Sequence, residues 1–263
     1  MLNKRKEICY RCGGKAISRE HIPPLCLFPE QKDQPDTNFR KNLITVPSCD
    51  EHNAKKSKDD EFLLLTLPSI VGNNAVGYIH TKTKLLRAYQ RLPKEFFEKA
   101  IARNAKDYFF KVDERATLFF SVANPDYKRF VRCFENIAAG LYFHEFKAVF
   151  SGRIVMHFGF VNYEKKDHNT FVSFLRNKFI QETNGSELKG NNREVFAYGF
   201  SPIEENSIKC LKLLFYESAD VYLAFIPDGI PQPSNIATEL INKGVQTTIT
   251  LGEKEFRFNF PSQ

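Results

Sequence analysis

The pattern of apolar and polar residues changes near residue 60 of this 263-residue chain. Residues 1 to about 60 are polar and interrupted by proline and glycine, and their apolar runs are too short for an ordinary core. The stretch DDEFLLLTLPSIVG (59–72) begins with acidic residues suited to a helix N-terminus and continues as an apolar stripe up to Pro68. Residues 73–82 have the composition of a loop or linker.

Helical and extended patterns alternate over the remainder of the chain. Helical periodicity is found at 81–106 (with an interruption at Pro93), 124–146 and 167–185. Extended, apolar patterns are found at 116–122, 153–161, 194–200, 208–216, 220–226, 245–251 and 254–260. Helices mixed with runs of strands favour an α+β fold, and the later strands predict a mainly antiparallel sheet.

This change of pattern predicts two domains. We expect a small domain at 1–65, a helix end and linker at 66–89, and a larger α+β domain at 90–263. Most of the 26 phenylalanines follow residue 90 and are expected to form the core of the larger domain, which should fold by itself. A segment as poor in core residues as 1–65 needs a staple, and a structural metal ion is the expected one.

Composition narrows the classes of protein. No run approaches the roughly 18 apolar residues of a membrane span, and no apolar stretch follows the basic residues near the N-terminus as in a secretory signal. Six cysteines in such a chain are expected to be reduced thiols or metal ligands, which indicates the cytoplasm. A net charge of +7 favours a polyanionic partner such as nucleic acid.

Two short motifs supply four candidate zinc ligands. Cys9 and Cys12 form a C-x-x-C knuckle, and Cys49 and His52 form a C-x-x-H knuckle. Zn²⁺ favours four tetrahedral nitrogen or sulfur ligands, and paired knuckles are how a short chain supplies them. Cys26 could compete, but it lies among apolar neighbours that suit a small buried side chain. The sequence therefore predicts a closed, structural zinc site.

The order of polar residues around these knuckles resembles the HNH endonuclease family. Glu20-His21 and Asn42 lie between the knuckles, and Asn53 follows the last ligand, with Lys56 behind it. The resemblance covers residues 9 to about 62, and the family's ββα-metal fold places a histidine at the end of the first strand. It implies a metal-dependent nuclease that hydrolyses phosphodiester bonds in DNA.

The resemblance also implies roles for individual residues. His21 would be the general base that activates a water, since an imidazole titrates near neutral pH. Glu20 and Asn53 would hold a catalytic Mg²⁺ through oxygen atoms. Asn42 would brace the loop that carries the histidine, and Lys56 would hold a phosphate near the metal.

Several alternatives stay open at this stage. The fourth zinc ligand of the family is usually cysteine rather than histidine, and Asn38 is a rival of Asn42 for the bracing role. His21 could be a turn residue without chemistry, and Asn53 could cap the following helix. The lysines around residue 56 could form a solvated face. The other four histidines belong to no ligand pattern and are treated as ordinary residues.

Three functions are therefore compared. The first is a DNA endonuclease, either free-standing or part of a mobile-element or antiviral system. The second is a zinc-stapled nucleic-acid-binding protein without catalysis. In the third, residues 90–263 regulate the nuclease by binding a partner or signal; that region could equally position DNA or form a homo-oligomer.

Overall fold

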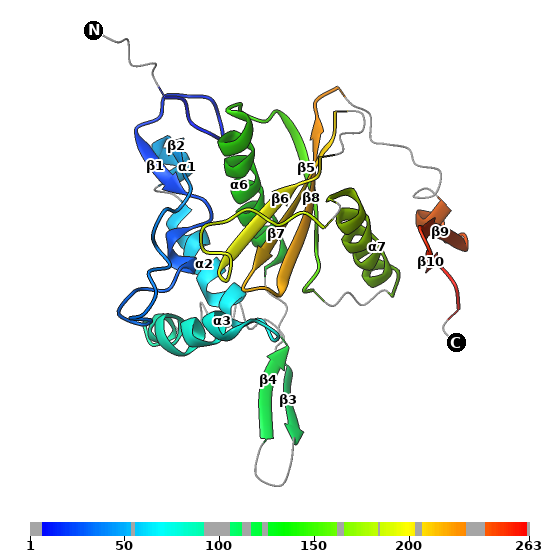
Figure 1. Cartoon of the computed structure of the whole chain (residues 1–263), viewed down its shortest axis with the longest axis horizontal. Coiled ribbons are helices and arrows are strands. Elements are labelled where there is room, and N and C mark those ends of the chain that lie inside the picture. Colours follow the sequence, from blue (N-terminus) through cyan, green and yellow to red (C-terminus); the bar gives the residue numbers. More distant parts are fainter. Residues whose placement is uncertain are drawn as a thin grey trace. The chain divides into compact units, whose positions relative to one another are not determined.

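A computed structural model of the chain describes most of its residues and divides it into two compact units. The described ranges are 7–53, 56–91, 106–111, 117–122, 126–161, 166–183, 185–202, 207–229 and 240–261. Unit 1 is Met1–Val149 and unit 2 is Phe150–Gln263. Each unit is described by itself (Figure 1).

Unit 1 begins with a two-stranded antiparallel hairpin. Strand β1 (Ser18–His21) pairs with β2 (Thr45–Ser48), so that His21 lies opposite Thr45. The short helix α1 (Asp50–Asn53) follows β2 directly, and α2 (Ser57–Thr66) comes next. Residues 62–66 of α2 are all buried, which explains the continuous apolar run at this point of the sequence. The order of these elements is strand, strand, helix (Figure 1).

Short helices and a second hairpin complete the middle of unit 1. These elements are η1 (Leu25–Leu27), η3 (Leu67–Ser69), α3 (Ala75–His80), the π-helical turn η4 (Thr81–Leu85), α4 (Leu86–Tyr89), β3 (Lys106–Lys111) and β4 (Thr117–Val122). The Asn74 side chain caps α3 by accepting a hydrogen bond from the backbone N–H of Gly77. Strands β3 and β4 pair only with each other among the described residues.

The long helix α6 (Tyr127–Phe146) packs against both the first hairpin and α2. Asp126 caps its N-terminus, and Lys147 ends it in a left-handed conformation with φ 56°. Phe130 meets Phe62 of α2 edge to face, with ring centroids 5.1 Å apart. At Gly140 the helix lies so close to Ile22 that an added Cβ would be 2.6 Å from Ile22 Cγ1. This close approach fixes α6 beside the residue that follows His21.

Unit 2 contains a four-stranded antiparallel sheet in the order β5-β8-β7-β6. Its strands are β5 (Gly152–Phe158), β6 (Phe196–Phe200), β7 (Lys209–Phe215) and β8 (Ala219–Pro227). The central strand β8 is buried along most of its length. Helix α7 (Lys166–Thr183) packs on the sheet, where Arg176 forms a bidentate ion pair with the buried Asp220. The hairpin β9 (Thr247–Leu251) and β10 (Lys254–Phe258) in turn contacts α7 through Phe174 and Phe256.

The expected α+β fold with antiparallel sheets is confirmed. The strands expected at 245–251 and 254–260 form a separate hairpin instead of joining the main sheet. Residues 73–82 contain α3 instead of a continuous loop, because Asn74 provides an N-cap. The division into compact units falls after Val149, so that α6 belongs to unit 1. An independently folding domain at 90–263 stays a prediction. The expected break at Pro93 lies outside the described residues. No helix in the described ranges combines the length and apolar character needed to cross a bilayer.

Candidate functional site

The two knuckles bring four ligand atoms together at one end of the β1–β2 hairpin. Cys9 and Cys12 lie in the turn before β1, whereas Cys49 and His52 lie at the start of α1, directly after β2. The ligand atoms of all four residues lie within 4.8 Å of one another. Pairing of β1 with β2 therefore joins knuckles that are far apart in the sequence.

The distances within this cluster are close to those around a tetrahedral metal ion. Cys49 Sγ lies 3.1 Å from His52 Nδ1, Cys9 Sγ lies 3.7 Å from the same nitrogen, and Cys12 Sγ lies 3.9 Å from Cys49 Sγ. Zn–S bonds of about 2.3 Å and Zn–N bonds of about 2.0 Å at tetrahedral angles separate the ligand atoms by roughly 3.5–3.8 Å. The cluster could therefore hold a metal ion such as zinc.

The environment of the cluster favours the metal-binding forms of its ligands. Burial lowers the pKa of His52, which keeps the imidazole neutral. Burial opposes ionisation of Cys9, but hydrogen bonds from the backbone of Cys12, Arg11 and Cys49 outweigh it and lower the pKa of this thiol. Cys26 is not part of the cluster; its thiol donates to the backbone oxygen of Asp60 at 3.2 Å.

His21 is the last residue of β1 and is half-buried. Burial lowers the pKa of its imidazole, and the positive charge of Arg40 lowers it further. The neutral form, which accepts a proton, is thus the main form of His21 at neutral pH. Arg40 is held in place by its own contacts, donating from Nε to the oxygen of Phe28 and pairing with Glu30. Arg40 could not be recognised from the sequence, because its relation to His21 exists only in the folded chain.

Glu20 points to the opposite side of β1 from His21, as neighbouring strand residues do. Its side chain is 4% exposed, and its Oε1 atom forms an ion pair with the ammonium of Lys56, which is 6% exposed. Asp60, one turn after Lys56 on α2, lies 3.6 Å from the same ammonium. The buried carboxylate of Glu20 and the partly exposed carboxylate of Asp60 therefore face one buried ammonium. We call these three residues the buried charge cluster.

Burial and ion pairing act against each other in this cluster. Burial raises the pKa of Glu20, although the Lys56 ammonium opposes that rise. Burial also disfavours the charge on Lys56, but the carboxylates of Asp60 and Glu20 outweigh burial and raise its pKa. Glu20 Oε2 is buried and accepts no hydrogen bond from the described residues. Asp60 was missed in the sequence, although its i,i+4 spacing from Lys56 was a readable signal.

The three asparagines considered as site residues, Asn38, Asn42 and Asn53, lie in two different parts of unit 1. Asn53 ends α1, and its Nδ2 donates to Ser18 Oγ at 2.8 Å, so it does not cap α2, whose N-cap position is Lys56. Asn42 adopts a left-handed conformation with φ 56°, which asparagine tolerates better than most residues. Asn38 Oδ1 accepts a hydrogen bond from the backbone of Arg40 at 3.0 Å. Both Asn38 and Asn42 therefore shape the segment before β2.

The structure thus places the expected residues on two sides of the hairpin. His21 is on one face of β1, whereas Glu20 and Lys56 meet on the other. Asn53 contacts Ser18, which shares the face of Glu20 along the strand. Comparisons of the chain with models of known protein families, with curated proteins and with solved structures found no match.

Proposed function

We propose that unit 1 is an HNH-type endonuclease that hydrolyses phosphodiester bonds in DNA with the help of a divalent cation. The observation that carries this proposal is the position of His21 at the end of β1, in a strand–strand–helix unit beside the Cys/His cluster. A net charge of +7 is consistent with a polyanionic substrate.

His21 would act as the general base. Its imidazole is half-buried and its pKa is lowered, so it can take a proton from the attacking water at neutral pH. Arg40 would keep His21 neutral before the reaction, and its charge would also favour the approach of a phosphate. The Cys/His cluster would hold zinc as a structural ion, with all four positions filled by protein ligands.

Glu20 and Asn53 would hold Mg²⁺ or another divalent cation. Both residues offer oxygen atoms, and Glu20 Oε2, which has no hydrogen-bond partner among the described residues, is a donor of the kind that a hard cation takes. When bound, such an ion would stabilise negative charge on the phosphate and on the leaving oxygen. Lys56 is buried and paired with Glu20, so we now assign it to the support of Glu20 rather than to direct contact with DNA.

The buried charge cluster also favours a second candidate, a zinc-stapled nucleic-acid-binding protein without catalysis. In this function the ion pair of Glu20 with Lys56 would be a permanent part of the core. Unit 2 would then serve binding or assembly, whereas in the first function it would be a regulator.

A plasmid-nicking assay separates the two candidates. The endonuclease predicts nicked plasmid that depends on added Mg²⁺ and is lost in His21→Ala. Binding of plasmid without nicking, over a series of divalent cations, would leave the binding protein as the function. The zinc content should be measured in each preparation, because loss of the Cys/His cluster would imitate loss of catalysis.

A further inference from the structure

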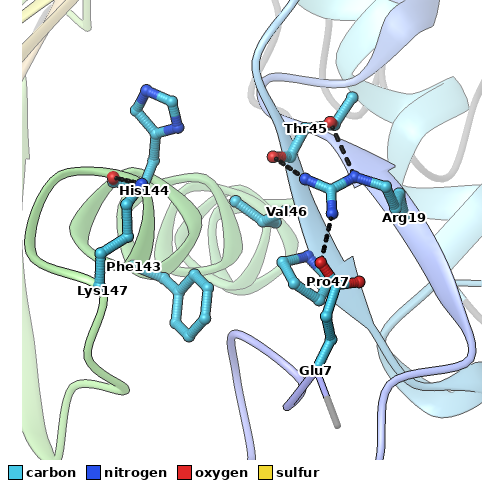
Figure 2. Close-up of a pocket in the computed structure, with 8 residues that line it drawn as sticks. All are labelled: Glu7, Arg19, Thr45, Val46, Pro47, Phe143, His144 and Lys147. Carbon is cyan, nitrogen blue, oxygen red and sulfur yellow. Dashed lines mark hydrogen bonds and ion pairs between the residues drawn. The ribbon is translucent and has the colours of Figure 1, made fainter. Parts of the chain in front are cut away.

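A pocket of about 230 Å³ lies between the outer side of the β1–β2 hairpin and the C-terminal end of α6, both in unit 1. Its floor is apolar and consists of Val46, Pro47 and Phe143. Its rim carries the charged side chains of Arg19 and Lys147 (Figure 2). The rim also carries the carboxylate of Glu7. A floor without charge and a rim with an excess of positive charge suit a ligand that has an anionic group and a flat or apolar part.

Arg19 is held in a fixed orientation at this rim. Its Nε donates to Thr45 Oγ1 at 3.1 Å, and its Nη2 donates to the backbone oxygen of Thr45 at 3.0 Å. A guanidinium that is oriented by its own strand partner loses little conformational freedom when it binds an anion. Lys147 is exposed at the end of α6, and its Nζ donates to the backbone oxygen of His144, a surface contact that an anion can replace.

An anion already contacts Arg19. Glu7 Oε1 accepts a hydrogen bond from Arg19 Nη1 at 3.0 Å, and both side chains are largely exposed. An exposed pair of this kind contributes about 0–1 kcal/mol, so a phosphate with charge on several oxygens can replace the carboxylate. Glu7 thus marks the position where an oxyanion is accepted.

Arg19 of the pocket lies on the same face of β1 as His21. Arg19 and His21 are two residues apart, and side chains at this spacing project to the same side of a strand. Their separation along the strand is roughly 6.6 Å, about twice the axial rise of about 3.4 Å per nucleotide in one DNA strand. A strand that presents one phosphate to His21 would, on this scale, bring the phosphate two nucleotides further along to Arg19.

We propose that this pocket binds a second backbone phosphate of the nucleic-acid substrate, between Arg19 and Lys147, with the adjoining sugar or base against Phe143 and Val46. This proposal rests on the proposed function, because it takes His21 as the place of the first phosphate. It assigns substrate positioning to residues that lie outside the zinc motif and adds α6 to the DNA-binding surface.

Fluorescence anisotropy with labelled 20-nucleotide DNA, single-stranded and duplex, tests the proposal in the full chain without added divalent cations. We expect Arg19→Gln and Lys147→Gln to weaken binding and to lower the salt dependence by about one phosphate contact each, a slope change of about 0.9 for duplex. Glu7→Gln should bind more tightly, because it removes the competing carboxylate. Lys82→Gln is the matched control, since it removes an exposed positive charge from η4, away from the pocket residues.

Equal behaviour of Arg19→Gln, Lys147→Gln and Lys82→Gln would overturn the proposal, as would weaker binding by Glu7→Gln. Release of the oligonucleotide by inorganic phosphate at constant ionic strength would assign the pocket to free phosphate and would also overturn it. Thermal melts show which variants are folded, and Lys147→Gln remains a valid test if Arg19→Gln is not. The proposed nuclease activity can fail independently of the pocket. If the unmodified protein nicks no plasmid but Arg19→Gln and Lys147→Gln still weaken DNA binding, the pocket is supported and the nuclease is refuted.

Discussion

His21 combines two properties that a general base requires, namely partial exposure and a lowered pKa. We predict that His21→Ala loses most plasmid nicking, by a factor of about 100 to 10,000, because the attacking water then lacks a positioned proton acceptor. DNA affinity, zinc content and melting temperature should stay close to those of the unmodified protein. His168→Ala, an exposed histidine of unit 2, serves as the control and should nick normally. Nicking by His21→Ala at the unmodified rate would refute the endonuclease.

Lys56 is expected to act on stability more than on DNA affinity. Lys56→Met leaves the buried carboxylate of Glu20 and the partly exposed carboxylate of Asp60 without a cation, and loss of one partner of a buried ion pair destabilises by about 3–5 kcal/mol. Urea denaturation monitored by circular dichroism measures this change. In Glu20→Gln/Lys56→Met the loss should be smaller than the sum of the single losses, since both charges of the pair are removed together. An unchanged denaturation midpoint for Lys56→Met would show that the ammonium is solvated.

We predict that His80 makes the stability of unit 1 sensitive to acid. It is fully buried, and burial lowers the pKa of its imidazole to about 4 from an ordinary value near 6.5. The unfolded chain therefore takes up a proton at His80 before the folded chain does. Stability should be full above about pH 6.5 and should fall as the pH drops from there towards 4, by roughly 3 kcal/mol in total.

The free energy of unfolding of unit 1, measured by urea titration between pH 7 and 4.5, checks this expectation. His80→Gln lacks the titrating group, so its stability should change less over the same range, whatever its value at pH 7. Parallel curves for the two proteins would mean that another group causes the acid sensitivity.

At the level of elements, the contact of α6 with Ile22, the residue after β1, depends on Gly140, which has no side chain. We predict that Gly140→Ala destabilises unit 1 by about 1–3 kcal/mol, although alanine favours helices, because its Cβ would meet Ile22 at 2.6 Å. Ile22 adjoins His21, so nicking should fall as well. Asn136→Ala, a half-buried position on the same helix, is the control and should not lower the melting temperature. A melting temperature of Gly140→Ala equal to that of the control would contradict this packing.

Most elements could be predicted from the sequence because their signals are local. The apolar stripe of α6 and the alternation in β7 needed no knowledge of distant residues. Pairing was harder, since nothing local shows that β9 and β10 form their own hairpin. The place of α6 in unit 1 was hard to predict for a similar reason, because its contacts with Phe62 and Ile22 are long-range and have no periodic pattern in the sequence.

In the candidate site, too, some residues have a local signal in the sequence whereas others depend on the fold. The four candidate metal ligands could be predicted because each knuckle has a characteristic spacing, and the structure brings all four together. The partners of Glu20 could not be predicted, because a buried ion pair depends on how β1 packs against α2. The influence of Arg40 on His21 likewise arises only from the folded path of the segment before β2.

For the whole molecule, we predict that the two units differ in how their secondary structure responds to removal of the metal ion. We expect fragment 1–149 to contain one tightly bound zinc and to lose its secondary structure when a chelator removes the ion, because its hairpin is joined at the Cys/His cluster. Fragment 150–263 should keep its circular dichroism spectrum under the same treatment, since its sheet and α7 bury each other.

Two cysteine variants of the full chain provide the matched comparison. Cys49→Ala should lose the zinc, whereas Cys26→Ala should retain one ion per chain, because Cys26 lies outside the cluster. Retention of zinc by Cys49→Ala, measured by elemental analysis, would contradict the assignment of the ligands. An unfolded fragment 150–263 would contradict the independence of the units.

The buried charge cluster has a consequence for the resting state of the proposed enzyme. Since Lys56 already neutralises Glu20, magnesium would enter by exchange with an internal cation and not by filling a void. The magnesium concentration for half-maximal activity would then measure the work of moving Lys56 as well as the strength of coordination. At low magnesium the chain would stay folded and inert, so the availability of the ion would decide when the nuclease works.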